Sequence, residues 1–205
     1  MMDLIVAERR ALVGVLEDLS ADQWHAPSLC EGWTVAHVVA HLTMPFRISP
    51  EEFGQGMAQA HGDFTVFSDA VAARDSELPQ ADLVAALRDN VANPWQPPGG
   101  GLVGALSHDI IHGLDTARPL GITYPVPDQA MTAVLDMAVS PGGESLFGFD
   151  LRGIELRASD LGWSSGTGDP VIGHSRDVLL LTAGRIVPPE AFTGPGVQRV
   201  WAGAR

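Results

Sequence analysis

The feature that most constrains the fold is a helical segment bounded at both ends by residues that break helices. The preceding run, residues 93–101, contains three prolines and three glycines, and Arg118-Pro119-Leu120-Gly121 follows the segment. Between them apolar residues recur at helical spacing, which predicts a helix over residues 102–117. His108 and His112 lie four residues apart in it and therefore share one helix face. Two imidazole rings so placed can converge on one metal ion.

A third histidine lies on another predicted helix. Thr34 is a good N-cap for a helix that runs to about Met44, just before Pro45, and carries His37 and His41 on one face. Three neutral imidazoles suit a divalent metal, and facing helices of a bundle commonly build such a site. We expect His41, His108 and His112 to bind one ion, although an H-x-x-x-H pair also arises by chance and a histidine on an apolar face can be a core residue.

Two neighbouring side chains bear on this site. Asp115 follows His112 by three residues, so its carboxylate can accept the other ring N–H of a ligand histidine. It can equally be a residue near the helix end. His37 precedes His41 by one turn and can be a fourth ligand, a base beside the ligands or a partly exposed residue. We favour a position beside the ligands or facing a substrate.

Composition excludes several classes of protein. The formal net charge is −13, and all 12 basic residues are arginine, so binding to a phosphate backbone is not expected. We expect no membrane association, because the sequence has no arginine-rich run and no apolar run of spanning length. The single cysteine, Cys30, excludes an internal disulfide and a cysteine-based metal cluster. It suits a reducing cytoplasm, as does an N-terminus without a signal-like apolar stretch.

The chain changes character after about residue 142. Before it, helical spacing predominates; after it, Ile154, Leu156 and Ala158 alternate with polar residues, which predicts a strand. We therefore predict an α+β, mainly α fold, with a helical part over 1–142 and a small α/β part over 143–205. The other predicted elements are helices over 3–19, 63–75, 79–91, 128–139, 175–181 and 195–201, a turn over 164–170 and a short strand over 171–173.

Three stretches resemble a known family. The first, Trp24 to Val35 followed by Val38-Val39-Ala40-His41-Leu42, closely resembles the opening motif of the mycothiol-dependent maleylpyruvate isomerase family. These actinobacterial proteins belong to the DinB-like four-helix-bundle superfamily. The second stretch is His108 to Asp115, and the third comprises residues 153–163 and 179–185. Together they extend over nearly the whole chain, and the first is the most specific.

The resemblance implies a DinB-like bundle, followed by a small C-terminal α/β part, whose metal is held by one histidine of the second helix and two residues of a later helix. His41 matches the first position and His112 the last. His108 stands where maleylpyruvate isomerases carry glutamate, whereas three histidines are the commoner pattern across the superfamily. Position 37, usually aspartate, is His37 here. Zinc is the favoured metal, with nickel or iron as alternatives.

The implied chemistry uses mycothiol as a thiol cosubstrate. A metal lowers the pKa of the thiol, and the thiolate adds to the cis double bond of maleylpyruvate. Rotation about the resulting single bond and loss of the thiol give fumarylpyruvate; in a transferase the thiol stays attached. A dicarboxylate needs a cation, for which Arg47, Arg118 and Arg199 are candidates. Arg118 is nearest the metal helix, where it can instead cap the C-terminus. We take His37 and Arg118 as candidate catalytic residues.

Three functional hypotheses remain. The first is a metal-dependent, mycothiol-using isomerase or S-transferase for a small electrophile, active as a monomer or homodimer. The second is a metal-dependent hydrolase, which requires a carboxylate base near a bound water. The third is a non-catalytic metal-binding or small-molecule-binding protein, which predicts a closed site with His37 as a fourth ligand. Trp24 and Trp33 are expected to pack the corner between helices, and Cys30 is expected to be a small buried residue.

Overall fold

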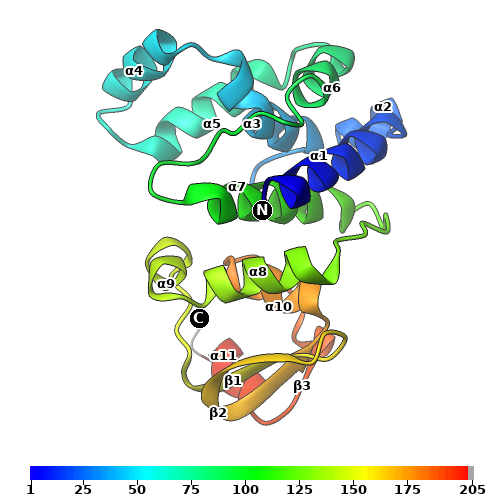
Figure 1. Cartoon of the computed structure of the whole chain (residues 1–205), viewed down its shortest axis with the longest axis vertical. Coiled ribbons are helices and arrows are strands. Elements are labelled where there is room, and N and C mark those ends of the chain that lie inside the picture. Colours follow the sequence, from blue (N-terminus) through cyan, green and yellow to red (C-terminus); the bar gives the residue numbers. More distant parts are fainter. Residues whose placement is uncertain (203–205) are drawn as a thin grey trace. The chain divides into compact units, whose positions relative to one another are not determined.

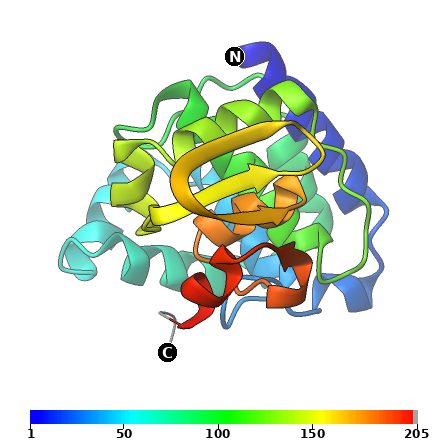
Figure 2. The ribbon, with the colours of Figure 1, turned by 90° about the horizontal axis from the view of Figure 1, so that it is seen from below.

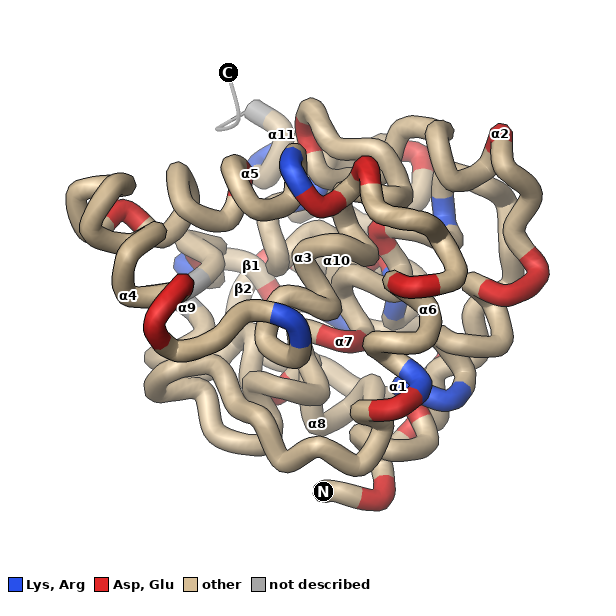
Figure 3. The backbone as a smooth tube through the Cα atoms, turned by 90° about the horizontal axis from the view of Figure 1, so that it is seen from above, with Lys and Arg blue, Asp and Glu red and all other residues tan. Residues whose placement is uncertain are grey.

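The computed structural model describes residues 1–202, apart from the side chains of residues 144–146 and 202. The chain divides into two compact units, Met1–Pro125 and Val126–Arg205, of which residues 203–205 lie outside the described range (Figure 1). The first unit is helical, and the second combines helices with a small sheet. The predicted mainly α, α+β fold class is therefore confirmed. Acidic side chains are spread over both units (Figure 3).

The first unit is a bundle of four helices to which three further helices, α2, α4 and α5, are added. Helices α1, α3, α6 and α7 pack pairwise in a closed cycle, α1 on α7, α7 on α3, α3 on α6 and α6 on α1. Helix α5 packs on α3, and α4 on α5. The helices of this unit are α1 (Met2–Glu17), α2 (Ala21–Trp24), α3 (Val35–Arg47), α4 (Pro50–Gln59), α5 (Phe64–Asp75), α6 (Gln80–Arg88) and α7 (Gly101–Ala117).

The four bundle helices share a core of large aliphatic side chains. Each contributes apolar residues at helical spacing, so that one stripe faces the bundle axis. Removing one such side chain from water contributes about 1.5–3 kcal/mol. The core therefore fixes how α3 and α7, the two helices that carry the histidines, lie against each other. Fully buried members include Leu12, Leu16, Leu42, Leu83, Leu87, Leu106 and Ile110.

Helix α3 differs from the sequence prediction because it continues past Pro45 to Arg47. A proline inside a helix removes one backbone hydrogen bond. Here side chains supply hydrogen bonds at the same turn: Thr43 Oγ1 donates to the Val39 carbonyl at 2.7 Å, and Arg47 Nη2 donates to the Ala40 carbonyl at 2.7 Å. The prediction that the helix ends before Pro45 is wrong, because these hydrogen bonds within α3 and the ion pair of Arg47 with Asp75 of α5 support the extra turn.

Arg47 is held by Asp75 of α5, which is buried. The two side chains form an ion pair with an Nη1–Oδ2 distance of 2.5 Å. Burial raises the pKa of the Asp75 carboxyl, but hydrogen bonds from Arg74 and Arg47 outweigh it and leave that pKa below its ordinary value. The Arg47 guanidinium therefore supports α3 against α5.

In its described part, the second unit comprises four helices, a short 3-10 helix and a three-stranded sheet of order β1-β2-β3. Helix α8 packs on α10, and α10 packs on β1. The alternating residues Ile154, Leu156 and Ala158 of β1 are buried, as the period-two pattern requires. The elements are α8 (Asp128–Ala138), α9 (Pro141–Phe147), β1 (Arg152–Ala158), β2 (Trp163–Gly173), α10 (Ser175–Thr182), η1 (Pro189–Ala191), β3 (Phe192–Thr193) and α11 (Gly196–Ala202).

The predicted turn over residues 164–170 lies within strand β2. These residues are part of one long, strongly curved strand (Figure 2), because Gly166 and Gly168 adopt positive φ angles of 87° and 137°. A Cβ at Gly168 would lie 2.2 Å from the Gly153 carbonyl oxygen, so glycine permits the close approach of the two strands. The chain turns between Ala158 and Trp163 and changes direction again near Gly166 and Gly168. Residues 163–166 pair with 158–155 in opposite order, and residues 167–173 pair with 152–158 in the same order.

The division between the two units falls at Pro125/Val126, whereas the boundary expected from the sequence lies at residue 142. Helix α8 belongs to the second unit because it packs against α10. A helical pattern does not reveal which neighbour its apolar face covers. Helix α8 ends at Ala138, one residue before the predicted end, and Pro141 begins α9, as proline can in the first turn.

Candidate metal centre

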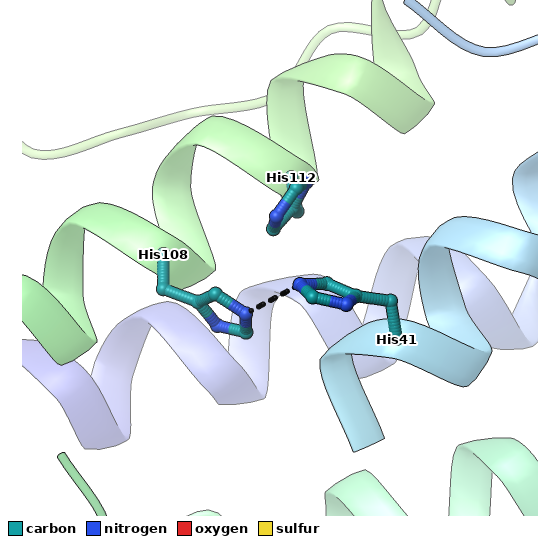
Figure 4. A group of neighbouring side chains, drawn as sticks. All are labelled: His41, His108 and His112. Carbon is teal, nitrogen blue, oxygen red and sulfur yellow. Dashed lines mark hydrogen bonds between the residues drawn. The ribbon is translucent and has the colours of Figure 1, made fainter. Parts of the chain in front are cut away.

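Helices α3 and α7 bring the three predicted histidines together. Figure 4 shows the rings of His108 and His112, from α7, and His41, from α3, pointing toward one another. One nitrogen from each ring lies within 4.8 Å of the other two, and the Nε2 atoms of His41 and His108 are 3.1 Å apart. His41 is buried, and the other two rings are half-buried. In the described part of the chain this group contains only these three residues.

These positions fit a tetrahedral divalent ion. Two nitrogen ligands on such an ion, each bound at about 2.0–2.1 Å, lie about 3.4 Å apart. The measured separation of 3.1 Å between the Nε2 atoms is close to that value. Two imidazole nitrogens facing each other at this distance need either a proton or a cation between them.

The opposite nitrogen of each ring faces an oxygen atom. His41 Nδ1 lies 2.8 Å from Ser68 Oγ on α5, and His112 Nδ1 lies 3.0 Å from Asp115 Oδ2. His108 Nδ1 is 3.4 Å from Asp109 Oδ1. Such partners fix the tautomer and the orientation of a metal-binding histidine. The pattern presents the Nε2 side of every ring to a common centre.

Asp115 lies where the sequence prediction placed it, beside His112. Its side chain is fully buried, and Oδ2 also lies 3.1 Å from the Cys30 sulfur. Cys30 Sγ is 3.9 Å from His112 Nδ1. Cys30, His112 and Asp115 therefore form a second group of possible metal ligands, whose ligand atoms lie within 4.8 Å of one another. Cys30, expected from the sequence to be a small buried residue, is half-buried, and the sequence did not predict its contact with Asp115. Nothing in the local pattern relates Cys30 to a carboxylate 85 residues away.

Asp109 forms an ion pair that the sequence did not predict. The fully buried Arg9 of α1 donates from Nε to Asp109 Oδ2 at 2.7 Å. Asp109 therefore joins a guanidinium on one side to the His108 ring on the other. Ser68 was likewise not predicted; it lies next to His41 because α5 packs on α3.

Two tryptophan rings border the histidines. Trp33 lies 5.3 Å from the His41 ring centroid and donates from Nε1 to Asp69, and Trp95, from the 93–101 loop, lies 5.3 Å from the His108 ring. Both are half-buried. Trp24 is 1% exposed and packs in the core as expected. Trp33 therefore contacts the site, besides packing the corner before α3.

The two candidate catalytic residues lie near the ends of the histidine helices. His37 is half-buried one turn before His41, with Nδ1 2.7 Å from Thr34 Oγ1, and it is not part of the three-histidine group. Arg118 follows α7 as its C-cap residue and is half-buried. Of the other candidate cations, Arg47 is paired with Asp75, and Arg199 contacts Asp169 and the Gly153 carbonyl in the second unit.

The fold and the site define a class: a helical bundle with a histidine cluster between two of its helices. Residues 5–93 match the model of the mycothiol maleylpyruvate isomerase N-terminal domain. This part of the chain is therefore similar to that domain, as the sequence motifs indicated. None of the described helices combines the length and hydropathy needed to cross a bilayer.

Two solved structures have a similar fold. One is a histidine-to-alanine mutant of a mycothiol-dependent maleylpyruvate isomerase, at 16% identity, 95% coverage of this chain, 91% coverage of that chain and a TM-score of 0.61. The other is a mycothiol-dependent maleylpyruvate isomerase, at 19% identity, the same coverages and a TM-score of 0.52. No curated protein matches the chain. At these identities the similarity concerns the fold.

Proposed function

We propose that this protein is a metal-dependent isomerase that uses mycothiol and acts on a small electrophile such as maleylpyruvate. The observation that carries the proposal is the cluster of His41, His108 and His112, each with an oxygen partner at Nδ1. The family of residues 5–93 supports mycothiol as the thiol. A thiol cosubstrate must stay reduced, so we place the reaction in the cytoplasm.

The three histidines would hold the ion, with zinc favoured and nickel or iron also compatible with this donor set. When bound, a divalent ion lowers the pKa of a coordinated thiol, so that the thiolate forms near neutral pH. Asp109 and Asp115 accept hydrogen bonds from the Nδ1–H groups of His108 and His112, so that the Nε2 lone pairs stay available to the ion. Ser68 holds the His41 ring in the same way.

The proposed reaction is reversible thiol addition. The thiolate attacks one carbon of the cis double bond, the resulting single bond rotates, and elimination of the thiol restores a trans double bond. His37, half-buried one turn from His41, is proposed to face the substrate and exchange protons with it. Arg118 is proposed to pair with a substrate carboxylate. An S-transferase would share the first step and retain the thiol on the product.

The geometry favours this function over the two alternatives. A hydrolase needs a carboxylate that is available to a bound water, but Asp109 and Asp115 are both buried against imidazole nitrogens. A non-catalytic metal protein calls for a complete ligand set, but His37 contacts Thr34 and does not join the three-histidine group. An open coordination position is what a thiol requires.

The test is a spectrophotometric assay of maleylpyruvate isomerisation, with and without mycothiol, on the zinc-loaded protein. We expect turnover only with mycothiol, and its loss in a His108→Ala/His112→Ala variant. The matched control is His25→Ala/His61→Ala, which removes two exposed imidazoles and should retain activity. Stoichiometric consumption of mycothiol would indicate the transferase. Turnover without any thiol, or full activity in the first variant, would contradict the proposal.

A further inference from the structure

We propose that Arg9 is a positioning residue that orients His108 by two separate routes, one through its helix and one through the neighbouring loop. The inference rests on the proposed role of His108 as a metal ligand. Arg9 lies on α1, 99 positions before His108 in the chain, and its side chain is fully buried. The hydrogen bonds of its side chain go to Asp109, Asn90 and Asn93 and not to the three histidines, so we infer that it acts through other residues.

The first route runs through Asp109. Arg9 Nε donates to Asp109 Oδ2 at 2.7 Å, and the other carboxylate oxygen, Oδ1, lies 3.4 Å from His108 Nδ1. A guanidinium that donates a hydrogen bond to a buried carboxylate limits the rotation of that carboxylate. The carboxylate accepts a hydrogen bond from the N–H at His108 Nδ1, so the lone pair of His108 lies on Nε2, which faces His41.

The second route runs through the 93–101 loop. Arg9 Nη1 donates to the carbonyls of Asn90 at 3.2 Å and Asn93 at 2.8 Å, just after α6. The side-chain oxygen of Asn93 accepts the backbone N–H of Trp95 at 3.0 Å, and the Trp95 ring packs against the His108 ring. One guanidinium therefore fixes both the carboxylate behind His108 and the start of the loop that covers it.

The desolvation cost of the buried Arg9–Asp109 ion pair indicates that Arg9 has a role besides stabilising the fold. A buried ion pair often stabilises a fold less than apolar side chains of the same volume. Here Arg9 Nη2 is buried and makes no hydrogen bond within the described residues, so its desolvation is not fully offset. The pair does supply geometry: the planar guanidinium directs Nε and Nη1 at fixed angles to two segments. Lysine carries the same charge without this fork.

The experiment compares Arg9→Lys with Arg10→Lys, the same change at the exposed neighbouring position. Cobalt affinity is measured by competition with a chelator, and the visible spectrum of the cobalt protein reports ligand geometry. The protein is labelled with 5-fluorotryptophan, and Trp95→Phe assigns the Trp95 fluorine resonance. We expect Arg9→Lys to lower cobalt affinity about 10- to 100-fold, to alter the spectrum and to shift the Trp95 resonance. Arg10→Lys should change none of these.

A second pair of variants separates the routes. Asn93→Ala should shift the Trp95 resonance while cobalt affinity stays within about threefold of the wild type, since the Asp109 route carries the orientation of the ligand. Asp109→Asn should lower the affinity as Arg9→Lys does, and it carries the test if Arg9→Lys does not fold. If folded Arg9→Lys or Asp109→Asn keeps the cobalt affinity, visible spectrum and Trp95 resonance of the wild type, this inference is overturned and the proposed function is not. A wild-type protein that binds no cobalt would overturn the proposed function and this inference with it.

Discussion

Glu8 on α1 provides a quantitative test of the bundle's interior. Its carboxyl is 1% exposed; Oε1 accepts a hydrogen bond from the Tyr124 hydroxyl, and Oε2 makes none within the described residues. The pKa of Glu8 is raised from 4.5 to about 7. Burial is the largest cause and the negative charge of Asp109 adds to it, while the hydrogen bond from Tyr124 lowers the pKa in part. The same surroundings raise the pKa of Tyr124. A charged Glu8 is therefore unfavourable in the folded protein.

The sign and size of the effect follow from linkage. Between the unfolded pKa of 4.5 and the folded value of about 7, the folded state binds more protons than the unfolded state. The free energy of unfolding therefore falls as pH rises through this window, by about 3 kcal/mol in total at about 1.4 kcal/mol per pKa unit. Glu8→Gln removes this titration and keeps an oxygen acceptor for Tyr124. Its new NH2 group lacks an evident partner, which costs about 1 kcal/mol.

The assay is urea unfolding of wild type and Glu8→Gln at pH 5, 6, 7 and 8. We expect the variant to be more stable by about 2 kcal/mol at pH 8. At pH 5 its stability should be about equal to that of wild type, because Glu8 is protonated in the folded protein but already largely ionised in the unfolded chain. Glu77→Gln, at an exposed position, is the control and should show no such trend. A difference between Glu8→Gln and wild type that stays constant from pH 5 to 8 would refute the reasoning.

Two further substitutions test the surroundings of the histidines. Ser68→Ala removes the oxygen partner of His41 Nδ1 and should weaken zinc binding about 10- to 100-fold in chelator competition; unchanged affinity would show that the partner is dispensable. Gly113→Ala places a Cβ about 2.5 Å from the buried Tyr124 ring, and the overpacking cost of about 1–3 kcal/mol should exceed a helix-propensity gain of at most about 1 kcal/mol. Gly14→Ala on α1, where a Cβ meets nothing within 4 Å, should instead raise the melting temperature, and a Gly113→Ala protein that gains stability equally would contradict the packing argument.

Local sequence patterns predicted the helices that carry the site. Periodicity and helix breakers located α7 within one residue, and the N-cap Thr34 located the start of α3. The i, i+4 spacing placed His108 and His112 on one face, and the i, i+3 spacing placed Asp115 beside His112. These relations lie within a single helix, where spacing determines proximity.

Contacts between elements could not be predicted in this way. The partners Arg9 and Asp109 are 100 residues apart, and Cys30 and Asp115 are 85 residues apart. Neither pair has a local signal, because each depends on how two helices or a loop and a helix pack. The same limit bears on the error at Pro45, where Arg47 at the end of α3 is paired with Asp75 of α5. In β2, the residues of the predicted turn over 164–170 also pair with β1, a contact that the turn pattern does not show.

The measurement that tests the central claim most directly is the metal content of the purified protein, determined by mass spectrometry after zinc loading and gel filtration. We expect about one ion per chain in the wild type and in the His25→Ala/His61→Ala control, and loss of the ion in His108→Ala/His112→Ala. Metal retained in that last variant, or a wild type that binds neither zinc nor nickel, would contradict the proposed metal centre.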